Sequence, residues 1–293
     1  YLLLRSKKIH PWIAFFCTTA FILFTQVTAY SAFGHSSKLR SMVYVPLIFL
    51  LIERFLHKRN LLYFSLASLF IGLQLLRAHI QICFYTQLMI GIFFIYWTVL
   101  QIKDKKKTGT ILLSGGLLIG IIFTGLILSS VLNLSVWEYS KYSIRGGTGS
   151  GLDFGYATSW SFPPLEILNL INPSFTGFGG STYWGPMAWT DFPIYFSVII
   201  LFLAGVGLIL KRNRTTWFFT IFAAIVLLIS FGKHIPVLYG PMYKFFPMFN
   251  KFRAPKMMMI FFGFSLTVLA AYGLQGILEF HKEEKDIVQN RLR

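Results

Sequence analysis

The feature that most constrains this chain is a series of apolar segments that recur from one end to the other. A helix needs about 20 mostly apolar residues to cross the hydrocarbon core of a bilayer. The alternating ten-residue strands of an outer-membrane barrel are absent. We therefore predict an all-α polytopic membrane bundle of about eight spans, at 11–33, 41–56, 61–76, 80–100, 108–134, 193–210, 215–231 and 257–280.

The composition supports a membrane protein and argues against a nucleic-acid partner. The 293 residues are 55% hydrophobic and only 13% charged, with a mean hydropathy of +0.64, whereas a soluble protein carries about 25% charged residues. The net charge of +17 comes from short basic clusters between the apolar segments. Such clusters set membrane topology and contact headgroups, so membrane lipids are the expected partners.

The basic clusters also predict the orientation. If the spans alternate, the clusters at 5–8, 57–60, 101–107, 211–214 and the tail 281–293 lie on one side, which the positive-inside rule makes the cytoplasm. We thus expect both ends to be cytoplasmic and 1–293 to be a single multi-pass transmembrane domain. The outer face then carries a long extracytoplasmic loop, 135–192, and loops of that length are generally functional.

A cationic stretch on the outer face opposes this charge bias. "FNKFRAPK" (249–256) places Lys251, Arg253 and Lys256 beside the last span. A phosphate would offset the cost of cations at this position through charge-assisted hydrogen bonds. We predict a phosphate-binding collar for a lipid carrier, completed by three residues on the same face: Arg145, Lys38 and His35. Snorkelling to headgroups is the alternative for each single cation.

Candidate catalytic and sugar-binding residues lie in the long loop. A general base requires a carboxylate or an imidazole, and the site-like acids are Asp191 and Glu166. Helix capping and a favourable helix-dipole contact are the respective alternatives. Four aromatic residues could stack on sugars or form an interface belt: Trp160, Tyr183, Trp184 and Trp189. The metal ligands are unknown because no HExxH or similar spacing occurs, so a divalent metal stays an open alternative.

Several blocks occur together in a familiar order. They are "FGHSSKLRSMVYVPLIFLLIER" (33–54), "RAHIQICFYTQL" (77–88), "EYSKYSIRGG" (138–147), "YATSWSFPPLEILNLINPSFTGF" (156–178), "YWGPMAWTDFPIYFS" (183–197) and "PMFNKFRAPKMMMIFFGFSLTVLAAYGL" (247–274). Through these blocks, nearly the whole chain resembles the YfhO-type bacterial membrane proteins, which look like C-type (GT-C) glycosyltransferases.

The resemblance implies an enzyme in the bacterial cytoplasmic (inner) membrane. It would be a hexosyltransferase-type glycosyltransferase that moves a sugar from a polyprenyl-phosphate carrier to a cell-envelope glycan or similar acceptor on the outer face. In that superfamily the catalytic acid usually lies in the first outer loop, which would precede Tyr1. The resemblance therefore implies a fragment that lacks the usual acid. The lipid-linked sugar is the donor, and no other cofactor is certain.

Other function classes stay open at this point. A transporter or flippase of a lipid-linked or anionic solute is the main alternative, although charges inside the spans are few, with Glu53 and Arg54 near the end of one span. An envelope-polymer ligase or polymerase would also use a large outer loop. A scaffold without catalytic activity would leave the outer cations without a role.

Overall fold

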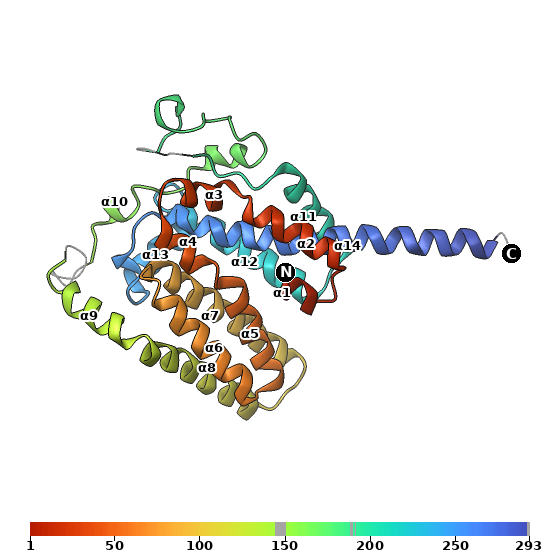
Figure 1. The fold of residues 1–293 in the computed structure, drawn as a ribbon, viewed down its shortest axis with the longest axis horizontal. Helices are drawn as coiled ribbons and strands as arrows, with labels where there is room; N and C mark the ends of the chain where they lie inside the picture. The colour runs from red at the N-terminus through yellow and green to blue at the C-terminus, as the bar shows by residue number, and fades with distance from the viewer. Residues whose placement is uncertain (144–150, 188–189, 191, 292–293) are drawn as a thin grey trace. The chain divides into compact units, whose positions relative to one another are not determined.

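The chain is helical throughout the part that the structure describes. The computed structural model describes residues 1–143, 151–187, 190 and 192–291, with side chains as far as His281, and these residues contain no β-strand. Every predicted apolar segment holds a helix or a pair of helices (Figure 1). These are α2 (Pro11–Ile22) with α3 (Thr25–Ala32), α5 (Val45–Lys58), α6 (Leu61–Leu75), α7 (Ile80–Lys103), α8 (Thr108–Leu128), α11 (Val198–Leu210), α12 (Arg214–Ser230) and α14 (Met259–Arg291).

Shorter elements connect these helices. The α-helical ones are α1 (Leu2–Ser6), α4 (Ser36–Met42), α9 (Ser130–Ser140), α10 (Phe154–Ala157) and α13 (Pro236–Phe245). The 3-10 helices are η1 (Pro164–Leu170), η2 (Gly180–Thr182), η3 (Phe249–Lys251) and η4 (Pro255–Met258), the last of which runs directly into α14.

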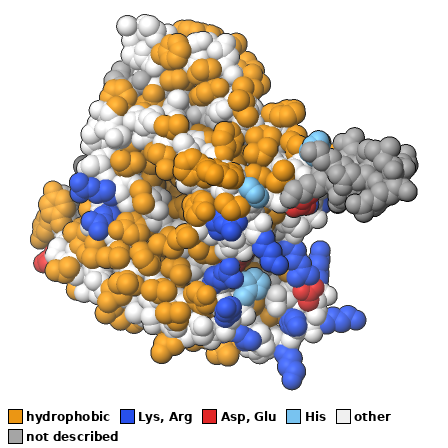
Figure 2. Space-filling view, turned by 45° about the vertical axis from the view of Figure 1, so that its right-hand side comes forward, with side chains coloured by type: hydrophobic (Ala, Val, Ile, Leu, Met, Phe, Trp, Pro, Cys, Tyr) orange, Lys and Arg blue, Asp and Glu red, His pale blue; other side chains and the backbone are white. Residues whose placement is uncertain are grey.

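Three of the described helices are long and apolar enough to cross a membrane. They are α7, α8 and the continuous helix Pro255–His281, and the bent pair α2–α3 makes a fourth if it counts as one span. Large apolar side chains are exposed on α2, α8 and α11, and Figure 2 shows such side chains over much of the visible surface. The all-helical prediction is confirmed, and the chain has helices of membrane-spanning type.

The predicted span 11–33 is broken in the structure. The helices α2 and α3 meet at an angle of 49°, although no Pro or Gly lies between Trp12 and Phe33. The break coincides with hydrogen bonds to an extended segment before α11, because the Thr25 hydroxyl donates to the carbonyl of Pro193 (2.7 Å) and accepts from the amide of Tyr195 (2.9 Å). Insertion of such a partner at a helix break is a recognised cause of a kink.

The described residues gather into two compact units. The first, unit 1, comprises Tyr1–Ala29, Thr158–Met242 and Ala254–Arg293, and the second, unit 2, comprises Tyr30–Ala157 and Tyr243–Arg253. Each unit is therefore assembled from segments that lie far apart in the sequence.

The core of unit 1 is α14, on which α2, α11 and α12 pack (Figure 1). In the apolar stretch of the helix Pro255–His281 that is suited to crossing a membrane, 89% of the residues are buried. Glycines allow α11 and α14 to approach closely, since a Cβ on Gly207 would lie 2.3 Å from the carbonyl oxygen of Leu269, and one on Gly273 would lie 2.0 Å from that of Leu203. Small residues at helix contacts are typical of membrane bundles, in which packing and not the hydrophobic effect holds helices together.

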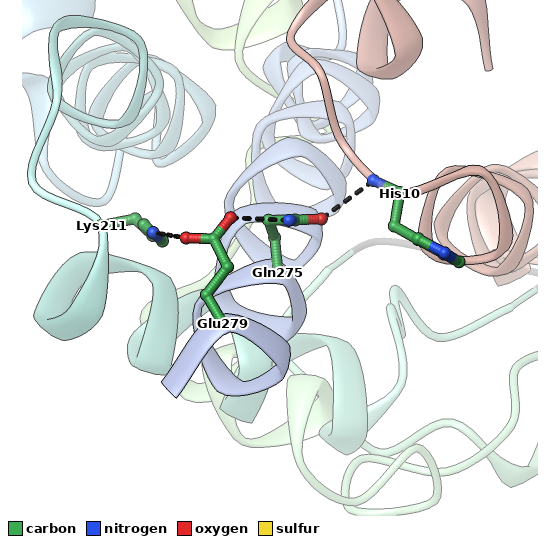
Figure 3. Close-up of polar contacts among 4 residues, drawn as sticks. All are labelled: His10, Lys211, Gln275 and Glu279. Atoms are coloured by element: carbon green, nitrogen blue, oxygen red, sulfur yellow. Dashed lines mark hydrogen bonds and ion pairs between the residues drawn. The ribbon is translucent and has the colours of Figure 1, made fainter. Parts of the chain in front are cut away.

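Polar contacts fix one end of this bundle. Lys211, which follows α11, forms an ion pair with Glu279 of α14. The amide group of Gln275 donates to the Glu279 carboxylate (2.6 Å) and accepts from the backbone N–H of His10 (2.9 Å), just before α2. Figure 3 shows these side chains in one row across α14. The row ties the start of α2 and the end of α11 to the same turn region of α14.

Unit 2 is built on the consecutive helices α5 to α8. The pairs α6–α8 and α5–α6 pack most extensively, and a Cβ on Gly125 would lie 2.7 Å from the Ile71 side chain. Inside this bundle the buried Gln74 amide donates to the carbonyl of Ser41 (2.9 Å) and to the hydroxyl of Thr86 (2.8 Å). These bonds join three helices where no water competes.

The glycine contact in unit 1 gives the first prediction. We expect Gly207→Ala to lower the free energy of unfolding by about 1–3 kcal/mol, because the added methyl group forces the backbones of α11 and α14 apart. Gly205→Ala is the matched control, since a Cβ there meets nothing within 4 Å and alanine favours a helix. Thermal unfolding in detergent measures both variants, and equal midpoints would contradict the close-packing argument.

Candidate functional site

The second half of the predicted outer loop is anchored to the ends of two apolar helices of unit 1. The amide of Lys256, at the start of η4, donates to the carbonyl of Trp160 (3.2 Å), and the amide of Phe162 donates to that of Ser230, the last residue of α12 (2.7 Å). Gly232 permits this fit, because its φ is +49° and a Cβ there would lie 2.0 Å from the Ser161 hydroxyl. The second half of the loop therefore begins beside the start of the continuous helix Pro255–His281.

Glu166 lies inside this loop and not on its surface. Its side chain is 1% exposed, and its carboxylate accepts a hydrogen bond of 2.5 Å from the Tyr183 hydroxyl, which itself accepts from the amide of Met187 (2.9 Å). Burial raises the pKa of Glu166, while the Tyr183 bond and the charge of Lys256 oppose that shift. The neutral carboxyl is therefore favoured to a higher pH than in an ordinary glutamate.

Lys256 reaches the same part of the loop from the start of the last span. Pro255 occupies the first helical position, which suits its fixed φ. The Lys256 ammonium donates to the Thr190 hydroxyl (2.8 Å) and lies 5.5 Å from the centre of the Phe192 ring. Since its charge also acts on Glu166, we call Glu166, Tyr183, Thr190 and Lys256 the acid–lysine cluster.

Arg253 belongs to unit 2 and has its own partners there. Its guanidinium donates to the Tyr156 hydroxyl (2.6 Å) and lies 5.5 Å from the centre of the same ring. The backbone carbonyl of Arg253 accepts from the buried amide of Gln81 (2.5 Å) at the start of α7, and Phe252 packs on Phe84 with ring centres 4.8 Å apart. These contacts fix the backbone beneath the guanidinium, so its orientation depends on Tyr156.

The residues of the predicted collar have different neighbours in the structure. Lys38 lies over the Tyr30 ring at 4.9 Å, and the His35 ring meets the same ring edge-on. Lys251 ends η3, and Arg145 lies outside the described residues. His35, Lys38, Lys251 and Arg253 belong to unit 2, whereas Lys256 belongs to unit 1. The one stretch of sequence thus contributes a cation to each unit.

The other predicted residues also differ in their surroundings. Asp191 and Trp189 lie outside the described residues. The Trp184 ring is exposed and lies 5.8 Å from that of Phe175, while Trp160 is half-buried and binds Lys256 through its carbonyl. Tyr183, predicted to stack on a sugar, holds Glu166 through its hydroxyl. Sequence reasoning did not single out Tyr156 and Gln81, because nothing local indicates partners 97 and 172 residues away.

Neither a metal centre nor a known relative defines the site. Among the described residues no group of three or more His, Cys, Asp or Glu is placed to hold a metal ion. Comparisons with protein-family models, curated proteins and solved structures give no match to the chain. A function is therefore inferred from the contacts of Glu166, Lys256 and Arg253 and from the resemblance in the sequence blocks.

Variants of Glu166 test its buried environment. Because its folded-state pKa is raised, ionisation of Glu166 destabilises the fold as the pH rises from the ordinary glutamate pKa, about 4.3, towards the raised value. Glu166→Gln keeps an acceptor for Tyr183 and removes the titration. We expect the wild type to lose stability relative to Glu166→Gln across that window, with a constant difference above it.

A second variant serves as the control for the hydrogen bond. Glu166→Ala leaves the Tyr183 hydroxyl without its carboxylate acceptor and should cost about 1–3 kcal/mol. Unfolding midpoints measured between pH 4 and 9 distinguish the two effects. Parallel pH curves for the wild type and Glu166→Gln would contradict the raised pKa.

Proposed function

We propose that this chain is part of a GT-C-like membrane glycosyltransferase of the YfhO type. The enzyme transfers a sugar from a polyprenyl-phosphate carrier to an envelope acceptor on the outer face of the bacterial cytoplasmic membrane, and its chain crosses that membrane about eight times. Three facts support this proposal: the ordered sequence blocks, the helices long enough to span a bilayer, and a large loop anchored at the ends of apolar helices.

The observation that carries the proposal is the position of Lys256. Its ammonium is held by Thr190 at the first turn of a helix that can span the membrane, which is where the phosphate of a membrane-embedded carrier would lie. During transfer the bond between the sugar carbon and the phosphate oxygen breaks, and negative charge grows on that oxygen. A fixed cation in a partly dry interface stabilises this charge without reorganisation.

The members of the acid–lysine cluster have different roles in the proposal. Since Glu166 is almost completely buried, the proposal assigns it the positioning of Tyr183 and of the backbone at Met187, both of which lie close to Lys256. Acceptance of the proton from the acceptor hydroxyl is assigned to no described residue. The cluster therefore binds and orients the donor in this proposal.

Arg253, which belongs to unit 2, is a candidate phosphate contact in its own right in the proposal. A guanidinium forms two parallel hydrogen bonds with a phosphate, which gives orientation as well as energy. The Arg253 guanidinium lies over the Tyr156 ring and donates a hydrogen bond to the Tyr156 hydroxyl. This arrangement pre-orients the group, so less conformational freedom is lost when an anion binds.

A transporter or flippase is the second candidate, and one observation favours it. The break between α2 and α3 lies against the extended segment before α11, with Thr25 bonded to that backbone. Broken helices beside unwound backbone are common at the binding sites of secondary transporters. Such a protein would move the lipid-linked sugar across the bilayer without breaking its glycosidic bond.

Replacement of the two cations tests the proposal. We expect Lys256→Met and Arg253→Ala to lower sugar transfer roughly 10- to 100-fold each, because a charge-assisted hydrogen bond contributes about 1.5–3 kcal/mol. Lys233→Met is the matched control, since Lys233 is exposed and follows α12. The assay supplies labelled polyprenyl-phosphate sugars to full-length protein in proteoliposomes. Unchanged transfer by Lys256→Met would refute the phosphate role, and label that crosses the bilayer without transfer would support the transporter.

Sidedness can be measured independently of activity. The native cysteines, Cys17 and Cys83, are buried, so an introduced thiol dominates labelling. We expect an impermeant maleimide to label Ser181→Cys in intact cells and Lys105→Cys only after permeabilisation, because these exposed residues lie in the predicted outer loop and cytoplasmic turn. The reverse pattern would place the cluster in the cytosol and contradict the proposal.

A further inference from the structure

The short helix η1 exposes three of its large apolar residues and buries its polar residues. Leu165, Ile167 and Leu168 are 40%, 37% and 41% exposed, and the next residue in the chain after η1, Ile171, is 56% exposed. By contrast, Glu166 is 1% and Asn169 0% exposed. A segment that faces water normally has the opposite distribution.

The buried polar side chains are satisfied by partners within the loop. Asn169 donates to the Thr176 hydroxyl (2.7 Å) and accepts from the Thr176 amide (3.1 Å), while Glu166 accepts from Tyr183. Burying a polar side chain is unfavourable unless it is hydrogen-bonded. These bonds therefore hold η1 in the orientation that exposes Leu165, Ile167 and Leu168.

The chain places this exposed apolar face at the level of a helix end. Residues 160 and 162, shortly before η1, bond to η4, which runs directly into α14, and to the last residue of α12. The helix that begins at Pro255 is long and apolar enough to cross a bilayer. A segment fixed at the end of such a helix lies near the boundary between headgroups and acyl chains.

We propose that the face formed by Leu165, Ile167, Leu168 and Ile171 inserts into the lipid surface at the Pro255 end of α14. Exposed aromatic residues of the same loop, Phe178 and Trp184, extend the apolar surface, and aromatic side chains are favoured at membrane interfaces. Apolar faces of surface segments enter the bilayer only as far as the headgroup and acyl boundary. The occupant of the face is bilayer lipid, whatever reaction the protein catalyses.

Fluorescent labels at single positions test this proposal. Leu168→Cys and Ile171→Cys replace exposed side chains, so folding should persist, and each is labelled with an environment-sensitive nitrobenzoxadiazole dye in full-length protein in lipid nanodiscs. We expect blue-shifted emission, several-fold weaker quenching by aqueous iodide than at the exposed reference Lys105→Cys, and stronger quenching by spin labels near the headgroup than by labels at the chain terminus.

Two outcomes would overturn the inference. Emission and iodide quenching equal to those at Lys105→Cys would show that the face lies in water. A blue shift without spin-label quenching, combined with loss of the shift when each nanodisc holds one copy, would show that a second copy covers the face. Because these measurements need no sugar transfer, their failure is distinguishable from failure of the proposed function.

Discussion

Lipid offers no hydrogen-bond partners, and this constraint explains where the polar groups of the chain lie. Within unit 2 the Gln74 amide finds its acceptors on neighbouring helices. Within unit 1 Thr25 satisfies the backbone of the extended segment before α11, and non-helical backbone in a membrane protein needs such partners. Glu166 and Asn169 are likewise buried inside their loop, where Tyr183 and Thr176 bind them. The loop is thus built like the membrane bundle to which it is anchored.

The cations follow a different pattern, because each has an aromatic ring and a hydroxyl group beside it. Lys256 lies beside Phe192 and Thr190, and Arg253 over Tyr156. Although only two residues separate Arg253 from Lys256 in the chain, the boundary between the units passes between them. The two cations are therefore proposed as separate phosphate contacts, one in each unit.

The sequence predicts the helices well because an apolar run is a local property. Each of the eight segments contains a helix. The sequence does not reveal the break at Thr25, the division into two units or the burial of Glu166, since these depend on residues more than a hundred positions away or on loop packing. The Tyr156 support for Arg253 was missed for the same reason. Composition identifies the charged candidates, but only tertiary contacts show which of them share a site.

The burial of α14 has a consequence for biosynthesis. This helix is the core of unit 1, yet it follows α2, α11 and α12 in the chain. The face of α11 that contains Gly207 consequently stays unpacked in the bilayer, or beside the insertion machinery, until α14 is inserted. The consecutive helices α5 to α8 can pair as soon as they are inserted. Unit 1 is therefore assembled only once α14 has been inserted, and truncations that remove α14 should leave α2, α11 and α12 inserted but unassembled.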